Sequence, residues 1–446
     1  MRQETITPAP AEAARLAEKS SLFDHPIGFW FIFWGEFAER CSYYGMRAIL
    51  LLYMTERLGF TDGQASANMS YFIAACYLLP LVGGYLADNY FGKYRTIVGF
   101  SLPYILGHVI LGIESVPFLV IALGLLAMGT GVIKPNISTL MGMTYDQQRP
   151  GQTRLRSDGF ALFYGAINIG SAISSFLMPW LRTHYGYQIA FLFPAALMGV
   201  AFVVFASGKP FYAKETIERK QLTPEDRRER LAVLGRILGL FVVVTFFWSI
   251  FDQSASTWTL FARDHLDLNI FGWSLEPDAI QGLNPILILL LLPPITLLWH
   301  FLGRMGIPVK ATDKMLLGFV LTTLTMAIMA VAGYRAGIHG RVSIHWEVVP
   351  YVMITTAEVC ISVVGLELAF TAAPPSMKSF VTACWFLTVF FGGILNSQVT
   401  PLYERLSPGN YFGLFALVMI PVTLAFVVIA RRFNRTVARL EREKVE

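Results

Sequence analysis

The chain of 446 residues is 55% hydrophobic and 15% charged, and its mean hydropathy is +0.54. Because about a quarter of the residues in soluble domains are charged, this composition excludes an ordinary soluble protein. Apolar runs of about 20 residues recur from end to end, which predicts an all-α polytopic membrane protein rather than an outer-membrane barrel. The net charge of +5 comes with no basic–aromatic module, so we expect no nucleic-acid partner.

Twelve apolar segments are long enough to cross a bilayer as helices. We place them at roughly 27–55, 66–88, 94–113, 116–142, 157–180, 187–206, 234–262, 279–302, 312–334, 346–372, 378–402 and 410–431. An even number of crossings puts both termini on one side. That side carries 26 lysines and arginines and the other carries 6, which predicts cytoplasmic termini. We expect no removable signal peptide in residues 1–25, which are polar.

A long charged segment separates six predicted spans from the other six. We therefore predict a cytoplasmic N-terminal segment (1–25), two six-helix bundles (26–206 and 234–433), a cytoplasmic linker between them (207–233) and a basic cytoplasmic tail (434–446). Two six-helix halves with a site between them are typical of major facilitator transporters. The predicted fold is therefore a twelve-helix facilitator with a central cavity.

The first predicted span carries charges inside an apolar segment, in the stretch GEFAERCSYYG (35–45). At 100° per residue, an arc of about 100° holds the side chains of Glu36, Glu39, Arg40, Tyr43 and Arg47. Tyr44 lies about 40° further round by the same geometry. This face cannot contact lipid, so we expect a functional cluster. The alternative is a structural Glu36–Arg40 pair, which leaves Glu39 and Arg47 without partners.

Three later spans hold charges as well. Lys134 lies near the middle of the fourth span, in GTGVIKPNIS, and we expect it to act as an anchor or switch or to extend to the interface. Asp252 and Glu358 are acids of the second half. Each can form a structural bridge with Arg47 or Lys134. A bridge that forms in one conformation and breaks in another would act as a gate.

Other polar and aromatic residues within the spans are individually less informative. Buried amides are more often structural than functional, and this applies to Asn168 and Asn284. Most aromatic residues in spans simply pack, as expected for Tyr77, Trp248 and Trp385. We expect structural roles for His108 and Glu367. The four cysteines have no disulfide or metal spacing, so we expect no metal and no cofactor other than protons as a coupling ion.

Several motifs resemble those of the proton-dependent oligopeptide transporter family of the major facilitator superfamily. EFAERCSYYG is similar to its signature E-x-x-E-R-F-x-Y-Y-G, GGYLADNYFGKYRTI (83–97) resembles its signature between spans 2 and 3, and FYGAINIGS (163–171) resembles its span 5 signature. GTGVIKPN, FWSIFDQ, GLNP and APPSMKSF follow in the order of the family. The resemblance covers about residues 26–435 and implies a twelve-helix carrier of di- and tripeptides with protons.

The resemblance also implies roles for individual residues. The proton-coupling residues would be Glu36, Glu39, Arg40 and Asp252. The substrate-binding residues would be Arg40, Tyr43, Tyr44, Tyr77, Lys134, Asn168, Trp248, Asn284, Glu358, Ser362 and Trp385. Arg40 and Lys134 would face the peptide carboxylate, and Glu358 with the two amides would bind the amino group. The gate salt bridges would involve Arg47, Asp252, Lys134 and Glu358.

Some features depart from the usual pattern of the family. Cys41 stands where the signature has Phe, and Asp252 stands where many bacterial members have Glu. Residues 207–230 are too few for the two extra helices that many bacterial members insert between the halves. The segment between spans 9 and 10 is too short for the extracellular domain of the animal intestinal type. We therefore expect a minimal bacterial member, monomeric and located in the inner membrane.

The function expected from these observations is proton-coupled import of di- and tripeptides by alternating access. A cavity with cations on one side and an acid on the other can hold both ends of a short peptide. A proton-coupled carrier of nitrate or another small anion or metabolite is the alternative, and Glu358 argues against it because an anion needs no acid. An intramembrane enzyme or a sensor is a remote alternative, because no zinc pair or nucleophile with a partner can be placed.

Overall fold

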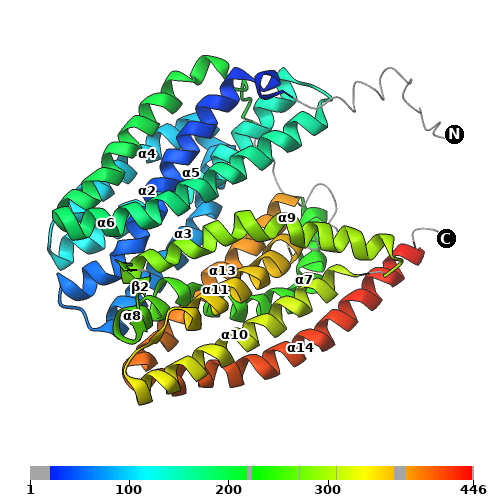
Figure 1. Ribbon diagram of the computed structural model, residues 1–446. Helices are drawn as coiled ribbons and strands as arrows, with labels where there is room; N and C mark the ends of the chain where they lie inside the picture. The colour runs from blue at the N-terminus through cyan, green and yellow to red at the C-terminus, as the bar shows by residue number, and fades with distance from the viewer. Residues whose placement is uncertain (1–20, 218–222, 271, 308, 366–377, 444–446) are drawn as a thin grey trace.

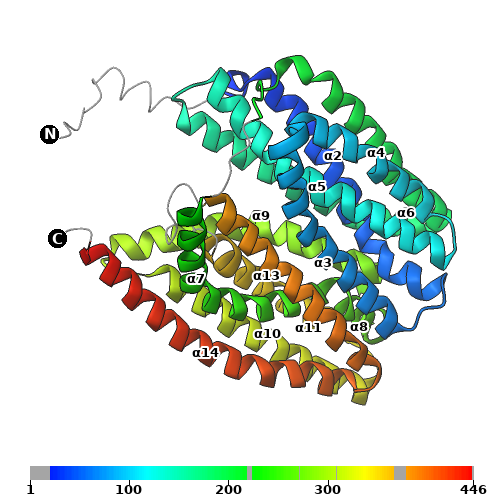
Figure 2. The same cartoon turned by 180° about the vertical axis from the view of Figure 1, so that it is seen from behind.

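The structure is a computed structural model that describes residues 21–217, 223–270, 272–307, 309–365 and 378–443. The predicted all-α polytopic fold is confirmed, because the long elements are helices rich in apolar residues. The helices form two bundles that lie side by side (Figures 1 and 2). The beginning of α2 and the end of α14 lie at the same end of the molecule, which we call the terminal end, and we call the opposite end the far end (Figure 1).

The N-terminal bundle contains five helices as continuous elements: α2 (Ile27–Glu56), α3 (Asp62–Leu86), α4 (Lys93–Leu111), α5 (Val116–Gln148) and α6 (Thr153–Ser207). Short helices η1 (Leu22–Asp24), η2 (Ala87–Phe91) and η3 (Lys209–Phe211) flank them. α6 consists of two helices that meet at Gly186, whose φ of 81° is left-handed. Glycine adopts this conformation without the steric cost of a Cβ, so the chain can turn there and cross back. The two parts match the predicted spans 157–180 and 187–206.

The C-terminal bundle is more interrupted. It contains α7 (Pro224–Phe251), η4 (Asp252–Ala255), α8 (Thr257–His265), η5 (Pro277–Gly282), α9 (Leu283–Arg304), α10 (Ala311–His339), α11 (His345–Glu358), η6 (Val359–Val363), α13 (Lys378–Val399), η8 (Thr400–Glu404) and α14 (Pro408–Glu443). Two short strand pairs cover the far end: β1 (Leu266–Asp267) is parallel to β4 (Val342–Ser343), and β2 (Asn269–Ile270) is antiparallel to β3 (Trp273–Ser274). Residues 366–377, with Glu367, lie outside the described part.

Ten described segments are long and apolar enough to span a membrane. α6 is one of them, although Gly186 divides it into two helices. α2 is not among them, and it differs from the others in carrying Glu36, Glu39 and Arg40 close together in its apolar sequence. The segments expose apolar side chains as a bilayer requires; on α9, for example, Leu290 and Leu297 are 63% and 68% exposed. We therefore treat this chain as a multi-pass membrane protein.

Local capping signals fix where several helices begin. At the start of α3, the Thr61 hydroxyl accepts a hydrogen bond from the Gln64 amide, and the Gln64 side chain accepts one from the Thr61 amide. This reciprocal pair satisfies two backbone donors that lack partners at a helix start. Gly92, with φ of 77°, separates η2 from α4. The GGYLADNYFGKYRTI motif therefore forms a turn rather than one long helix.

The bundles are held together at the far end. Arg182 of α6 contacts Glu276 at 2.9 Å and Asp278 of η5 at 3.2 Å. Arg263 of α8 contacts Asp62 of α3 at 2.8 Å, and Glu404 of η8 accepts a hydrogen bond from the backbone of Gly63. These contacts join the two halves of the sequence, so we refer to them together as the far-end closure.

Toward the terminal end the two bundles diverge (Figure 2). A hollow of about 340 Å³ lies there between helices of both halves. Its walls include Tyr85 and Lys93 at one bundle and Thr382 and Phe386 of α13 at the other. The structure therefore has its far end closed and a hollow open on the side of the termini.

Candidate functional site

A central cavity of about 100 Å³ lies between the bundles, on the far-end side of this hollow. Its polar and charged lining comes from both halves of the chain: Tyr44, Arg47, Tyr77, Ser171 and Ser175 from the N-terminal bundle, and Trp248, Asp252, Ser254, Gln281, Asn284 and Glu358 from the C-terminal bundle. Phe251, Pro285 and Val389 complete it. Seven of the predicted site residues thus line one cavity, although they come from six separate helical elements.

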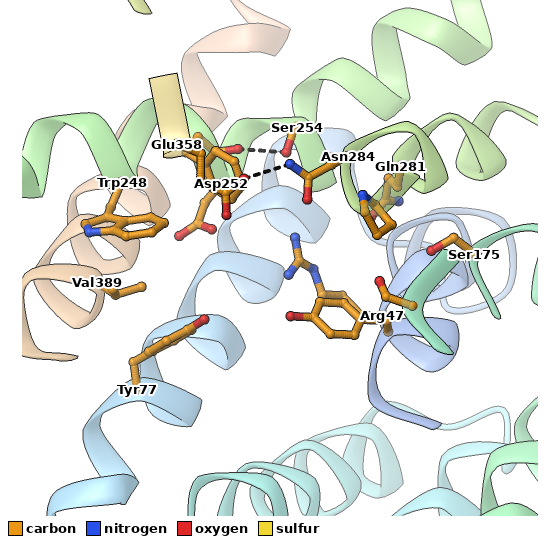
Figure 3. A pocket seen from close by; sticks show the side chains of 14 residues that line it. Arg47, Tyr77, Ser175, Trp248, Asp252, Ser254, Gln281, Asn284, Glu358 and Val389 are labelled. Atoms are coloured by element: carbon orange, nitrogen blue, oxygen red, sulfur yellow. Dashed lines mark hydrogen bonds between the residues drawn. The ribbon is translucent and has the colours of Figure 1, made fainter. Parts of the chain in front are cut away.

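The C-terminal wall of the cavity carries two carboxyl groups. Glu358 accepts a hydrogen bond of 2.8 Å from the Asn284 amide, which also donates to the Thr355 hydroxyl at 3.1 Å. Asp252 lies beside Glu358 in Figure 3 and is 4% exposed. Both acids sit where regular helix is interrupted: Asp252 begins the 3₁₀ segment η4, and the π-helix η6 follows Glu358. Such interruptions are frequent at functional sites because they free backbone groups and redirect side chains.

The N-terminal wall presents one guanidinium. Arg47 of α2 points toward the side of the cavity that holds Asp252 and Glu358 (Figure 3). Its side chain lies over the ring of Tyr44 at 5.9 Å. Within the described residues, neither Arg47 nor Asp252 forms an ion pair in this conformation. The predicted Arg47–Asp252 bridge is therefore not formed here. Since both groups line the same cavity, the bridge stays a prediction for another conformation.

A second charged cluster lies in the N-terminal bundle, outside the lining of the cavity. Arg40 contacts Glu36 at 3.2 Å and is also paired with Glu39. Its other donor reaches the Thr130 hydroxyl of α5 at 3.2 Å. All three charged residues are only 2% exposed. The shared helix face expected from the sequence therefore holds two carboxylates around a single guanidinium, instead of a simple pair.

Lys134 lies beside the cavity and does not line it. Its ammonium sits 4.4 Å from the ring centre of Tyr77, which does line the cavity, and 5.8 Å from that of Phe386 on α13. A lysine over an aromatic face is held by the ring quadrupole. Among the described residues it has no carboxylate partner within ion-pair distance. The predicted Lys134–Glu358 bridge is therefore not formed in this conformation and stays a prediction.

Four other predicted binding residues lie outside the cavity lining. Tyr43 is buried, with Arg40 above its ring at 5.5 Å. Asn168 donates to the backbone carbonyl of Tyr164 at 2.9 Å. Trp385 packs edge-on against Phe241, and Ser362 is half-buried in η6. In this conformation the contacts of Tyr43 and Asn168 named here lie within their own helices, and Trp385 packs between α13 and α7. The contact of these four residues with a substrate stays a prediction.

The cavity also includes residues that sequence reasoning missed. These are Ser171, Ser175, Phe251, Ser254, Gln281, Pro285 and Val389. Gln281 donates to the backbone of Ala48 at 3.2 Å and so connects η5 with α2. A signal was present for two of them: Ser171 and Ser175 are four residues apart and extend the polar face that begins at Asn168. The others follow from tertiary packing.

The arrangement can bind a small ligand that has both signs of charge. Arg47 offers donors for an anionic group, and Glu358 and Asp252 offer acceptors for a cationic one. Hydrogen bonds in which one partner is ionised are roughly twice as strong as neutral ones, so opposed charges in a small cavity select and orient a ligand. The surrounding serines, amides and aromatic rings provide further polar contacts and apolar walls.

Comparison with known proteins shows what the chain resembles. It matches the POT family over residues 94–234 and 219–414. It is 29% identical to an uncharacterized transporter of Bacillus subtilis over 90% of this chain and 93% of that protein. It is 31% identical to solute carrier family 15 member 1 of Homo sapiens over 71% of this chain and 53% of that protein, so it spans about half the length of that relative.

Solved structures agree with this relationship. A mutant of the peptide transporter POT, crystallised in complex with alafosfalin, superposes with a TM-score of 0.83 at 28% identity. The match covers 96% of this chain and 99% of that one. The motifs, the two-bundle architecture and these similarities together lead to one conclusion. The chain belongs to the POT family.

Proposed function

We propose that the protein is a proton-coupled symporter that imports di- and tripeptides by alternating access. The observation that carries this proposal is the central cavity, in which Arg47 of one bundle faces Asp252 and Glu358 of the other. Every short peptide with free ends has an ammonium at one end and a carboxylate at the other. A cavity with opposed charges can bind both ends and leave the side chains free to vary.

The buried Glu36–Glu39–Arg40 cluster supports proton coupling. Two carboxylates share one guanidinium there and are almost fully shielded from solvent. A proton that binds either carboxylate removes its attraction to Arg40, which frees the guanidinium for a new partner. Protonation of Asp252 would likewise remove its attraction to Arg47. Proton binding thus changes the charge pairs on which the relative stability of the two end states depends.

Alternating access fits the asymmetry between the two ends. The far-end closure seals one side, while the hollow of about 340 Å³ opens toward the side of the termini. We propose that this terminal side is the cytoplasm, because lysines and arginines are concentrated there. The protein would then be a monomeric carrier of a bacterial inner membrane, captured with its site open inward.

The relatives support peptides as substrates. The structural neighbour described above is a peptide transporter crystallised with alafosfalin. This chain has the charged cavity that such a substrate class requires. An anion carrier would need no acid on the C-terminal wall, where this protein has both Glu358 and Asp252.

The test is uptake of labelled dialanine into proteoliposomes that contain the purified protein, with and without an inward proton gradient. We expect accumulation that an uncoupler abolishes. Glu358→Gln should weaken the apparent affinity for dialanine roughly 10- to 100-fold, because hydrogen bonds to charged groups contribute about 1.5–3 kcal/mol. Glu114→Gln is the matched control, since Glu114 is partly exposed and pairs with Arg57 at 3.8 Å within the N-terminal bundle.

Two comparisons separate the parts of the proposal. Glu39→Gln should abolish gradient-driven accumulation while peptide exchange without a gradient continues. Nitrate uptake in the same vesicles tests the alternative substrate. Transport of nitrate without dialanine would overturn the peptide assignment, and full gradient-driven accumulation by Glu39→Gln would overturn the role of the cluster in coupling.

A further inference from the structure

One carboxyl group of the C-terminal bundle has no part in the mechanism above. Glu347 lies in the first turn of α11 and is 0% exposed. Among the residues that the structure describes, neither of its carboxyl oxygens has a hydrogen-bond partner. A buried ionised carboxylate without a partner is highly unfavourable, whereas the neutral acid tolerates such surroundings. The surroundings of Glu347 in this conformation therefore suit a neutral acid and disfavour a carboxylate.

Glu347 lies at one end of a polar stripe on α11. Glu347, Tyr351, Thr355 and Glu358 follow one another at spacings of four, four and three residues, so they share one face of the helix. The Tyr351 hydroxyl donates to the backbone carbonyl of Ser254 at 3.1 Å, and Ser254 lines the central cavity. The stripe therefore runs from the far end of the bundle to the substrate-facing Glu358.

The groups that interact with Glu347 in the described structure are tyrosine hydroxyls. Glu347 interacts electrostatically with Tyr351 of its own helix and with Tyr403 of η8. The centre of the Tyr403 ring lies 5.1 Å from that of Tyr411 of α14, and the buried Tyr403 hydroxyl lacks a hydrogen-bond partner in the described structure. Trp258 of α8 packs edge-on against Tyr351 at 5.2 Å. None of these neighbours is a cation, and the guanidinium of Arg47, which lines the central cavity, acts electrostatically on Tyr351 and forms no ion pair with Glu347 among the described residues.

The acids that act on Tyr403, apart from Glu347 itself, belong to the far-end closure. Asp264 of α8 and Asp62 of α3 act electrostatically on Tyr403, and both are already paired with Arg263 at 2.8 Å. Tyr403 is followed directly by Glu404, whose carboxylate accepts a hydrogen bond from the backbone amide of Gly63 in the other bundle. The same short segment η8 thus interacts electrostatically with Glu347 through Tyr403 and takes part in the closure between the bundles.

From these contacts we propose that Glu347 is an additional proton-binding site that the far-end closure controls. While the far end is closed, Glu347 holds its proton as a neutral acid. When the bundles separate at the far end, Asp62 and Gly63 leave α8 and η8, and water reaches the carboxyl group. The O–H bond then breaks, the proton passes to external water, and the carboxylate takes a proton back before the end closes.

This proposal rests on the alternating opening proposed above and is independent of the substrate. It also differs from the role of the Glu36–Glu39–Arg40 cluster, in which carboxylates exchange a guanidinium partner. Glu347 has no such partner to exchange in the part of the chain that the structure describes. Its protonation instead determines whether the far end can close over it, because closure on an ionised carboxylate would bury an unpaired charge.

The first test is infrared spectroscopy of the full chain in lipid nanodiscs near neutral pH, without any substrate. We expect Glu347→Gln to remove one carbonyl-stretch band of a protonated carboxylic acid. Glu347→Asp should keep such a band at a shifted frequency, which keeps the test informative if the glutamine variant does not fold. Glu225→Gln is the control, since Glu225 is exposed at the start of α7 and should affect only carboxylate absorption. A spectrum in which Glu347→Gln removes no acid band overturns the proposal.

The second test measures how fast this band shifts after transfer to D₂O. Asp62→Asn weakens the contact with Arg263 and should favour opening of the far end. We expect exchange to accelerate about tenfold or more, which corresponds to roughly 1.4 kcal/mol in the opening equilibrium. An unchanged rate would overturn control by the closure and leave Glu347 as a static acid. Neither test involves peptide, so failure of the peptide assignment in the uptake assay is a separate result.

Discussion

Arg182 is the cation at the centre of the far-end closure, and removing its charge should open that end. It contacts Glu56 of α2 at 3.5 Å, Glu276 at 2.9 Å and Asp278 at 3.2 Å. The side chain of Asp278 is 0% exposed, whereas those of Glu56 and Glu276 are 42% and 34% exposed. Arg182→Gln therefore leaves one fully buried carboxylate without a cation as long as the bundles remain closed.

The exposed and buried contacts differ in size. Partly exposed pairs contribute about 0–1 kcal/mol each. Breaking a buried pair by removing one partner destabilises by about 3–5 kcal/mol, because the remaining charge stays buried. Opening of the far end would return Asp278 to water, so this cost falls on the closed state alone. We expect the ratio of open to closed molecules to rise about 100-fold or more, which is the ratio for roughly 3 kcal/mol.

Spin-label distances across the far end provide the assay. Tyr185 of α6 and Trp273 of β3 are 56% and 83% exposed and lie on opposite bundles, so cysteines there can be labelled. The four native cysteines are buried. Double electron–electron resonance should show a longer distance in Arg182→Gln than in the parent. Asp278→Asn should have a smaller effect, because it removes the buried charge and leaves Arg182 with two partners.

The matched control is Arg57→Gln. Arg57 contacts Glu114 at 3.8 Å with both side chains substantially exposed, and both residues belong to the N-terminal bundle. We expect no change in its distance distribution. If Arg182→Gln and Arg57→Gln gave the same distances as the parent, the inference that the Arg182 contacts hold the far end closed would be wrong.

Other expected results concern the linker, the terminal end and the cavity. Glu215 accepts hydrogen bonds from the backbone amides of Lys93 (2.5 Å) and Tyr94 (2.9 Å) and so caps the start of α4. Because such a cap contributes about 1 kcal/mol to stability, Glu215→Ala should lower the thermal unfolding midpoint in detergent. An unchanged midpoint would contradict this. Burial lowers the pKa of His25, so the fold favours the neutral ring, and stability should decrease as the pH falls through about 6.5 and below. His25→Gln should reduce this dependence in melts recorded over that range, and equal slopes for both proteins would argue against it. Tyr77→Phe should preserve peptide uptake, because it keeps the aromatic ring beneath Lys134. Tyr77→Leu removes this ring and should lower peptide uptake by the equivalent of about 0.5–2 kcal/mol. Equal uptake by both variants would refute the cation–π role.

The local part of the site followed from the sequence. Glu36 and Arg40 are four residues apart in an apolar segment, and helical geometry alone brings them to one face. The structure places them 3.2 Å apart, with Glu39 on the same guanidinium. The ends of α2 agree with the predicted span within one residue, because a long apolar run in a membrane has no alternative to a helix. The family motifs identified the remaining candidates by resemblance.

Contacts between distant helices did not follow in the same way. Arg47 and Lys134 were both expected in salt bridges, and in this conformation neither has a carboxylate partner among the described residues. Which pairs form depends on how the two bundles are placed relative to each other, and under the alternating access proposed above this placement would change. Gln281 was missed because its place in the lining depends on the packing of η5 against α2.

The sequence by itself determined the membrane class, the order of the helices, the side on which positive charge gathers and the polar face of the first span. Each of these depends on residues that are close in the chain or on the composition of one segment, so hydropathy and helical period are sufficient. The tertiary structure decided which acids share the cavity, which end is closed and that Glu347 is buried without a partner. These properties depend on contacts between segments hundreds of residues apart, such as Asp62 with Arg263, and no local pattern encodes the relative placement of two rigid bundles.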